Sequence, residues 1–227
     1  MLKEEFKEIT DRAFEMDEKI ENIVVDFEGE IINDEYVNID FYKSTFKGIN
    51  ILETNFEKVS FVNCEFENCN FSNANFENVS FIRTKFKNCK FTGTVFLKSR
   101  FDNVEYTDSN LCYSNFSLGT INGLTYKDSV MRNMYFEENK HKNLVITNCD
   151  LTSASFFKTK LKDVDLSSDI ISGLIIGFDD IRGALIDPLQ ATDLVGLLGV
   201  KFKWRGRPLY FFVKNQIIPW KIKQKKI

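Results

Sequence analysis

Residues 69–83 read CNFSNANFENVSFIR, and the three phenylalanines Phe71, Phe76 and Phe81 are five residues apart. The same spacing continues in both directions, from Ile31 to Ile186, without an insertion or deletion. Of the 32 residues at these positions, 31 are large and apolar, and His141 is the exception. Because only 43% of the chain is hydrophobic, chance does not explain this regularity.

A period of five residues fits neither a helix, which repeats at about 3.6, nor a half-buried strand, which repeats at 2. A chain that turns a corner every five residues points each fifth side chain inward, and four such turns close a square coil. Stacked coils pair as short parallel strands about 4.8 Å apart, and neighbouring coils supply the stability. The sequence therefore predicts an all-β fold, a quadrilateral β-helix of about eight coils over residues 31–186. Residues 20 apart then stack, and the predicted ring column comprises Phe56, Phe76, Phe96, Phe116, Phe136 and Phe156.

Two other positions of the repeat support this prediction. The residue two before each central residue is small or slim, as at Cys69, Ala74 and Val79, because a second inward side chain must fit beside the ring. The residue just before the centre is often Asn or Asp, such as Asn70 and Asn75. These side chains hydrogen-bond nearby backbone and tolerate the dihedral angles of tight turns.

The blocks CNFSN, ANFEN and VSFIR (69–83) and CDLTS and ASFFK (149–158) resemble the pentapeptide-repeat consensus A-(D/N)-(L/F)-x-x. The resemblance covers roughly two-thirds of the chain and implies a right-handed quadrilateral β-helix. The repeat followed by DPLQATDLVGLLGVKF (187–202) is also similar to the ending of the Qnr-type quinolone-resistance proteins. That similarity implies a C-terminal helix and strand that join two rods end to end; the tail from Trp204 onward departs from it.

Residues 1–30 precede the repeat and carry 11 acidic and 4 basic side chains. An apolar stripe at spacings of four and three predicts a helix; it comprises Leu2, Phe6, Ile9, Ala13, Met16, Ile20 and Ile23. We expect this acidic helical segment to cap the first coil, whose rings and strand edges would otherwise be exposed. A short coiled-coil dimer is the alternative.

Residues 187–227 follow the repeat and carry 9 basic and 2 acidic side chains. Asp187 suits a helix N-cap, Pro188 the first turn and Gly199 the C-terminal end. Then VKFKW (200–204) and LYFFV (209–213) flank Arg205–Pro208 and predict a hairpin. We expect this helix and basic hairpin tail to form a homodimer; the candidate dimerisation residues are Leu194, Val195, Leu197, Leu198, Phe202, Trp204 and Phe211. Membrane-surface association through Trp204, Trp220 and the basic tail is an alternative.

The overall charge, with 30 basic and 33 acidic residues, gives no reason to expect direct nucleic-acid binding. No apolar run is long enough to cross a bilayer. The N-terminal MLKEEFKEITDR carries carboxylates where a secretion signal has a basic start and an apolar middle. We therefore expect a cytoplasmic protein whose five cysteines are plain thiols.

Two columns of like charge are the candidate partner-binding residues. The acidic column comprises Glu57, Glu77 and Glu137; the basic stripe comprises Lys140, Lys142, Lys160, Lys162 and Arg182. Like charges stacked a few ångströms apart cost stability, so each set is either a solvated, salt-screened surface or a partner-binding surface.

The sequence contains no Walker A, GxSxG or HExxH motif and no metal-spaced His/Cys cluster. The single histidine, His141, sits at an inward position, where we expect it buried and neutral. We therefore predict a non-enzymatic binding protein with no cofactor and no metal. The Qnr resemblance implies that it binds DNA gyrase or topoisomerase IV and modulates the enzyme or protects it from quinolone-type poisons, by DNA mimicry in that group. A scaffold for an unrelated protein partner is the alternative, because residues 31–186 carry a net charge of only -3.

Overall fold

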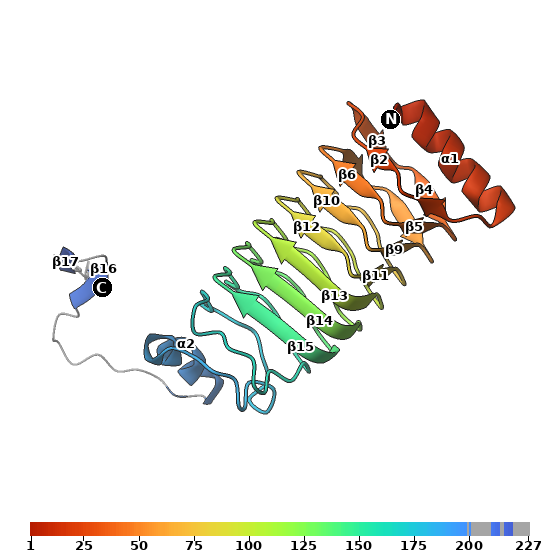
Figure 1. Ribbon diagram of the computed structural model, residues 1–227. Coiled ribbons are helices and arrows are strands. Elements are labelled where there is room, and N and C mark those ends of the chain that lie inside the picture. The colour runs from red at the N-terminus through yellow and green to blue at the C-terminus, as the bar shows by residue number, and fades with distance from the viewer. Residues whose placement is uncertain (199, 201–209, 214–215, 220–227) are drawn as a thin grey trace, which may run out of the picture.

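The computed structural model describes residues 1–198, 200, 210–213 and 216–219. The coils stack along one axis into a rod, with the N-terminal helix at one end and the C-terminal helical segment near the other (Figure 1). The elements, in chain order, are α1 Lys3–Met16, β1 Ile20–Glu21, β2 Val24–Val25, β3 Glu30–Ile32, β4 Glu35–Val37, β5 Asp40–Tyr42, β6 Thr45–Lys47, β7 Asn50–Leu52, β8 Asn55–Glu57, β9 Ser60–Val62, β10 Glu65–Glu67, β11 Ser80–Ile82, β12 Lys85–Lys87, β13 Arg100–Thr107, β14 Thr120–Lys127, β15 Lys140–Thr147, η1 Pro188–Gln190, α2 Ala191–Leu194, η2 Val195–Leu198, β16 Tyr210–Val213 and β17 Gln216–Pro219.

The predicted register is confirmed, because strands pair in parallel at an offset of 20 residues. Phe61 pairs with Phe81, and Phe66 pairs with Phe86. From β1 to β15 the strands complete about six turns, slightly fewer than the eight expected. The coil then continues through turns and isolated bridges, such as Asp165 to Leu185.

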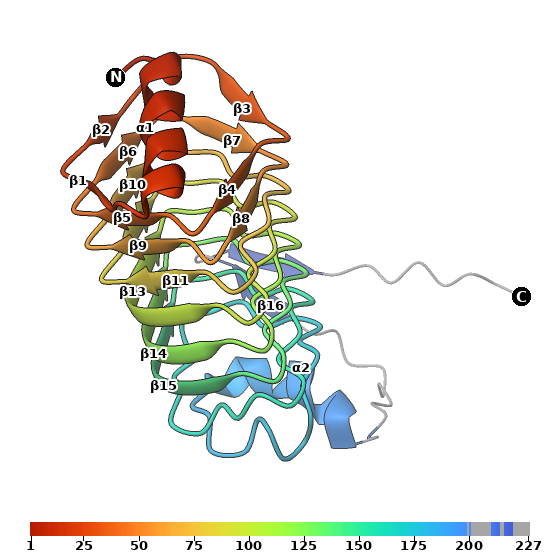
Figure 2. The ribbon, with the colours of Figure 1, turned by 90° about the vertical axis from the view of Figure 1, so that its right-hand side faces the viewer.

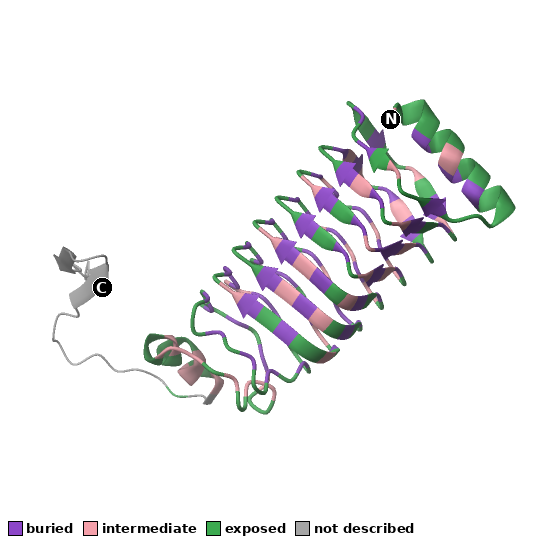
Figure 3. Ribbon diagram, viewed as in Figure 1, coloured by how far each residue is buried: buried purple, intermediate pink, exposed green. Residues whose placement is uncertain are grey.

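The core consists of the residues at every fifth position, which are buried from Ile31 to Ile176 apart from His141. Figure 3 shows how buried and exposed positions alternate along each strand. The Phe56 column exists as predicted, but only its first four rings are stacked: Phe96 and Phe116 lie 4.3 Å apart at 23°, whereas Phe136 and Phe156 are tilted by 43°. Aliphatic residues such as Ile121 and Leu151 replace phenylalanine around the last rings and leave them room to tilt.

The corners lie two residues after each centre, where residues such as Asn73, Asn78 and Lys98 have a left-handed backbone. The Asn or Asp before the centre hydrogen-bonds nearby backbone as expected, but it is not the residue with the left-handed backbone. Its side chain accepts a hydrogen bond from the backbone two residues on: Asn75 accepts the Glu77 N–H at 3.1 Å. The small inward residues also do more than fit, because the Thr94 hydroxyl donates to the carbonyl of Phe71 at 2.7 Å.

Helix α1 lies across the first coil, as expected of a cap (Figure 2). It buries Phe6, Thr10 and Ala13, and the Phe6 ring lies 5.9 Å from that of Tyr36. The helix ends at Met16, which is exposed, as is Leu2.

The expected stripe was therefore too long at its C-terminal end, and the coil begins at Ile20 instead of Ile31. Ile20 pairs with Phe41 and Val25 pairs with Phe46, each at an offset of 21 residues. One extra residue near Gly29, whose φ is 105°, interrupts the five-residue spacing and hides this first half-coil in the sequence.

The C-terminal segment Pro188–Leu198 closes the other end. Asp187 is the predicted N-cap and accepts the Leu189 N–H at 2.8 Å. The Gln190 amide donates to the carbonyls of Leu166 and Asp169, which fixes the segment to the last coils.

The hairpin expected between residues 200–204 and 209–213 lies largely outside the described residues. Tyr210–Val213 pairs in an antiparallel sense with Gln216–Pro219, downstream of it. Only two residues separate these strands, which is the shortest common hairpin connection. Within the described part of the chain, no helix is long and apolar enough to span a membrane.

Candidate binding faces

The rod has four walls, each built from one repeat of every coil. We name them by their central residues: the first wall contains Phe71, Phe91 and Leu111; the second Phe76, Phe96 and Phe116; the third Phe81, Phe101 and Ile121; the fourth Phe86, Tyr106 and Tyr126. In most repeats the residue before the centre and the two after it are at least partly exposed; Val62, Ser117 and Ser155 are among the buried exceptions. Any binding surface on the rod is therefore a pattern of these three positions over successive coils.

The third wall brings the predicted basic stripe together. Lys140 and Lys142 extend from β15, and the exposed Lys160 and Lys162 follow on the next coil. Lys160 is paired with Asp180 at 3.0 Å, and Arg182 lies 3.8 Å from Asp179. Within the described residues, Lys140, Lys142 and Lys162 have no ion-pair partner, so about half of the stripe carries uncompensated positive charge.

The second wall holds the predicted acidic column, but the structure does not bring it together as one surface. Glu57 lies 3.4 Å from Lys58, and Glu77 lies 2.7 Å from Lys98. Glu137 accepts a hydrogen bond from the Ser155 hydroxyl. Leu97 and Ser117 occupy the two coils between Glu77 and Glu137. The column is thus interrupted and locally neutralised, which weakens any likeness to the continuous charge of a DNA duplex.

His141 was expected to be buried and is instead half-buried. Its backbone pairs with Ile121 in β14, so it occupies the inward position of its coil. The ring turns toward the next coil, where Nε2 contacts the carbonyl of Lys160. A carbonyl only accepts, so this nitrogen carries the proton and the ring ties two coils together. This contact explains a polar residue at a core position without any catalytic role.

The second wall also carries a feature that the charge-based prediction missed. Beyond residue 100 its outward positions hold large apolar side chains, each about half exposed: Leu118, Tyr135, Phe157, Ile175 and Phe178. Exposed apolar surface concentrated on one face is typical of a protein contact. The signal was present in the sequence, because these positions are polar in most other repeats, but it becomes a surface only when residues 20 apart are placed side by side.

The candidate dimerisation residues differ in their surroundings. Leu194 and Leu197 are partly buried against the core of their own chain, so their apolar side chains already cover the last coil. Val195 is half-buried. The side chain of Leu198, Phe202, Trp204 and the side chain of Phe211 lie outside what the structure describes.

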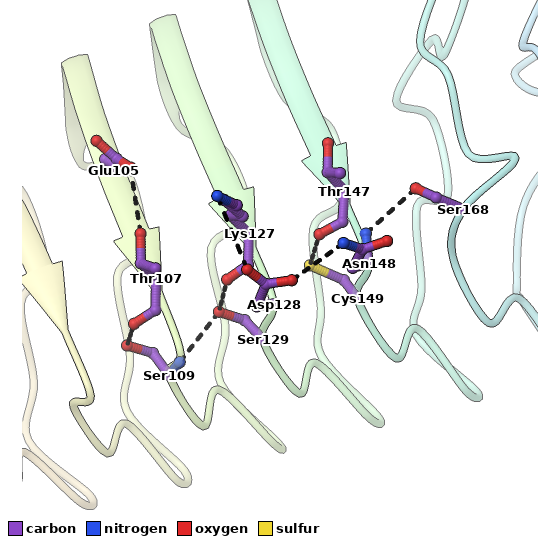
Figure 4. A network of polar contacts seen from close by, with 10 residues as sticks. All are labelled: Glu105, Thr107, Ser109, Lys127, Asp128, Ser129, Thr147, Asn148, Cys149 and Ser168. Carbon is purple, nitrogen blue, oxygen red and sulfur yellow. Dashed lines mark hydrogen bonds and ion pairs between the residues drawn. The ribbon is translucent and has the colours of Figure 1, made fainter.

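The corner between the fourth and first walls carries a ladder of polar contacts between coils (Figure 4). The Asn148 amide donates to Asp128 at 3.1 Å, and the Ser109 N–H donates to the hydroxyl of Ser129 at 3.1 Å. That hydroxyl in turn donates to the carbonyl of Lys127 at 2.8 Å. The polar groups are satisfied by one another, which supports the register of the coils and leaves little for a ligand.

The thiols are free, as predicted, and four of the five are buried. Burial raises the pKa of Cys64 and of Cys149 to about 11, so both remain protonated at neutral pH. Cys64 donates to the carbonyl of Phe41 at 3.4 Å. A protonated, buried thiol is a poor nucleophile. No cluster of three or more metal-ligating side chains exists among the described residues.

Comparison with known proteins agrees with this geometry. Residues 59–129 match the pentapeptide repeat region model, and residues 39–78 match the model of pentapeptide repeats in eight copies. No curated protein matches the chain significantly.

Two solved structures illustrate the structural likeness. A trypsin-treated variant of QnrB1, a plasmid-mediated fluoroquinolone resistance protein, is 18% identical with a TM-score of 0.46, covering 82% of this chain and 99% of that one. HetL, a pentapeptide repeat protein involved in heterocyst differentiation regulation from the cyanobacterium Nostoc sp., is 11% identical with a TM-score of 0.42, covering 77% of this chain and 94% of that one. Such distant likeness carries no functional argument. The two family models show that residues 39–129 carry pentapeptide repeats, and the five-residue period and the quadrilateral coil continue the same pattern from Ile31 to Ile176.

Proposed function

We propose that this chain is a non-enzymatic binding protein and that the third wall of its rod binds an acidic surface of a protein partner. The observation that carries the proposal is the set of exposed cations Lys140, Lys142 and Lys162, which have no ion-pair partner among the described residues, whereas Lys160 and Arg182 beside them are paired. Holding like charges on adjacent coils costs stability, and a complementary partner removes that cost.

A type II topoisomerase, DNA gyrase or topoisomerase IV, is the partner that we propose to test first. Residues 187–202 support it through their similarity to the Qnr-type ending, from which the tail beginning at Trp204 departs. The interrupted acidic column speaks against mimicry of DNA by charge. We therefore propose that the topoisomerase binds the basic stripe. Binding would modulate the enzyme or protect it from quinolone-type poisons.

The test compares the natural chain with the variant Lys142→Glu/Lys162→Glu in direct binding to purified gyrase and in a supercoiling assay with and without a quinolone. The natural chain is expected to bind and to change the supercoiling activity, and the variant to lose binding at least tenfold with an unchanged circular dichroism spectrum. The matched control is Lys87→Glu/Lys90→Glu, which reverses two exposed lysines on the fourth and first walls, away from the third wall.

The possible outcomes test separately whether gyrase is the partner and whether the basic stripe is the contact surface. No effect of the natural chain at micromolar concentration removes gyrase as the partner. Equal binding by the natural chain and the stripe variant removes the basic stripe as the contact. If gyrase is removed, the alternative is a scaffold for another acidic protein, for which the same pair of variants is the test.

A further inference from the structure

We propose that a second copy of this chain packs against the second wall in an antiparallel arrangement, through the column Leu118, Glu138, Lys158 and Phe178. This inference goes beyond the proposed function, which concerns a different protein and the third wall. It places the homodimer contact on the side of the rod, where an apolar surface is exposed, and not at the C-terminal end.

The four residues are 20 apart in sequence, each two positions after the centre of its repeat. Leu118, Glu138 and Lys158 lie at the same left-handed corner of three successive coils, and Phe178 lies in the turn that follows Gly177 on the next coil. Lys158 Nζ lies 3.3 Å from Glu138 Oε1, which confirms that neighbouring members of the column touch. Leu118 is 48% exposed and Phe178 is 50% exposed. Along the rod the column therefore presents an apolar, a negative, a positive and again an apolar side chain.

Such an order is complementary to itself when it is reversed. A two-fold axis between the coils of Glu138 and Lys158 places Leu118 against Phe178 of the second copy and Glu138 against its Lys158. The two ion pairs, one from each copy, then form a group of four alternating charges. An axis through either charged coil would instead set Glu138 against Glu138 or Lys158 against Lys158. The charges thus select a single antiparallel register.

The neighbouring positions permit this approach. Ser117 and Gly177, which directly precede the two apolar members of the column, are small and face each other in the same register. Tyr135 and Phe157, both about half exposed, add apolar surface at the centre of the wall. Apolar side chains therefore surround the charged pair of Glu138 and Lys158, so the proposed contact would remove these charges from water.

Leu118 itself provides an independent observation. Its φ is 61°, in the left-handed region that a bulky residue enters only at a cost. The corresponding corners of the preceding coils carry Lys58, Asn78 and Lys98. Within its own chain Leu118 gains little burial in return for this backbone conformation. A partner surface that covers the side chain accounts for a leucine at this corner.

The first experiment is a cross-link in a Cys112→Ser background, because Cys112 is the one cysteine of the five that is not buried. In one chain, Leu118 and Phe178 are three coils apart, about 14 Å at ~4.8 Å per coil, too far for a disulfide. Oxidation with copper-phenanthroline is expected to give a covalent dimer from Leu118→Cys/Phe178→Cys. Neither single variant is expected to cross-link, whereas a parallel dimer would cross-link Leu118→Cys alone.

The second experiment measures mass against concentration by sedimentation equilibrium. Glu138→Lys and Lys158→Glu are each expected to weaken self-association at least tenfold, and the double variant to restore it. Leu118→Asp should abolish it, while the control Val145→Asp, on the exposed surface of the fourth wall, should not. A monomer at every concentration, no cross-link from the double-cysteine variant, or equal loss with Val145→Asp would overturn the proposal.

Discussion

The ring of Phe76 lies 4.4 Å from that of Phe56 and 5.2 Å from that of Phe96, with the planes within 11° and 7° of parallel. These contacts join residues 20 apart in sequence, so each ring is buried by the coils before and after it. No coil is buried by its own residues alone. The stability of the rod is therefore distributed along the column and is most sensitive in its middle.

Replacing Phe96 by alanine is expected to destabilise the fold by about 3–5 kcal/mol, because the ring is completely buried between two others. Urea unfolding followed by circular dichroism measures this free energy. The control is Phe157→Ala on the same wall, whose ring is 46% exposed, with an expected change within about 1 kcal/mol. Equal losses in the two variants would contradict the inward assignment of every fifth residue.

The fold was predictable because a single uninterrupted period fixes the register over the whole repeat. Once Phe61 and Phe81 are vertical neighbours, every other pair follows. The ends were harder, because they do not repeat. The extra residue near Gly29 concealed the first half-coil, so Ile20 was assigned to a helix and lies in a strand.

The cap formed by helix α1 is expected to depend on Phe6. Its ring is buried against Phe27 and Tyr36, at 5.9 Å from each. Phe6→Ala should therefore cost about 3 kcal/mol of unfolding free energy. Phe14, on the same helix, is 54% exposed, so Phe14→Ala is the matched control and should cost less than about 0.5 kcal/mol. Thermal unfolding of both variants measures the difference; a larger loss from Phe14→Ala would instead favour a helix that dimerises through its outer face.

The corner at Tyr113 predicts a stabilising substitution. Tyr113 has a φ of 61° and is 61% exposed, so it carries the cost of a left-handed backbone without much burial in return. Tyr113→Asn is expected to raise the unfolding free energy by about 0.5–1 kcal/mol, since Asn adopts this conformation more readily. The reverse substitution one coil further, Asn133→Tyr, should lower it. Chemical denaturation of the two variants tests both signs, and changes of the same sign would remove backbone strain as the explanation.

The candidate site was only partly predictable from the sequence. The basic stripe followed from the period, since Lys142 and Lys162 are 20 residues apart. The partial neutralisation of the stripe's charge was not predictable from the period, because Asp180, which pairs with Lys160, lies in a turn that departs from the regular coil. The apolar second wall was missed because its members, such as Tyr135 and Phe157, occupy different positions within their repeats and gather only on the folded surface.

Asp169 predicts a pH dependence of stability. It replaces the small residue found at this inward position in the other coils, accepts the Cys149 N–H at 2.7 Å, and has a second oxygen that is buried without a partner. Burial raises the pKa of this carboxyl to about 6. Because the folded-state pKa is above the unfolded value of 3.8, folding favours the protonated form. Its contribution is therefore fully present below about pH 4 and is lost as the pH rises through about 6.

Asp169→Ser, which restores the residue type of Ser109 and Ser129, is expected to remove this loss. Urea unfolding at pH 4.5 and pH 7 measures it, and the variant should gain more at pH 7 than at pH 4.5, by about 1–2 kcal/mol. Other carboxylates contribute the opposite pH dependence to the unfolding free energy, and comparing the variant with the natural chain cancels their contribution. Asp150 is an example: partial burial raises the pKa of its carboxyl, but its hydrogen bonds to Thr152 and Arg132 lower that pKa by more. Asp165→Ser, at an exposed position whose carboxyl pKa is lowered by its hydrogen bonds to Ser167, should shift the difference in the opposite direction. A gain from Asp169→Ser that is equal at the two pH values would mean that the side chain costs stability through its shape and not through its charge.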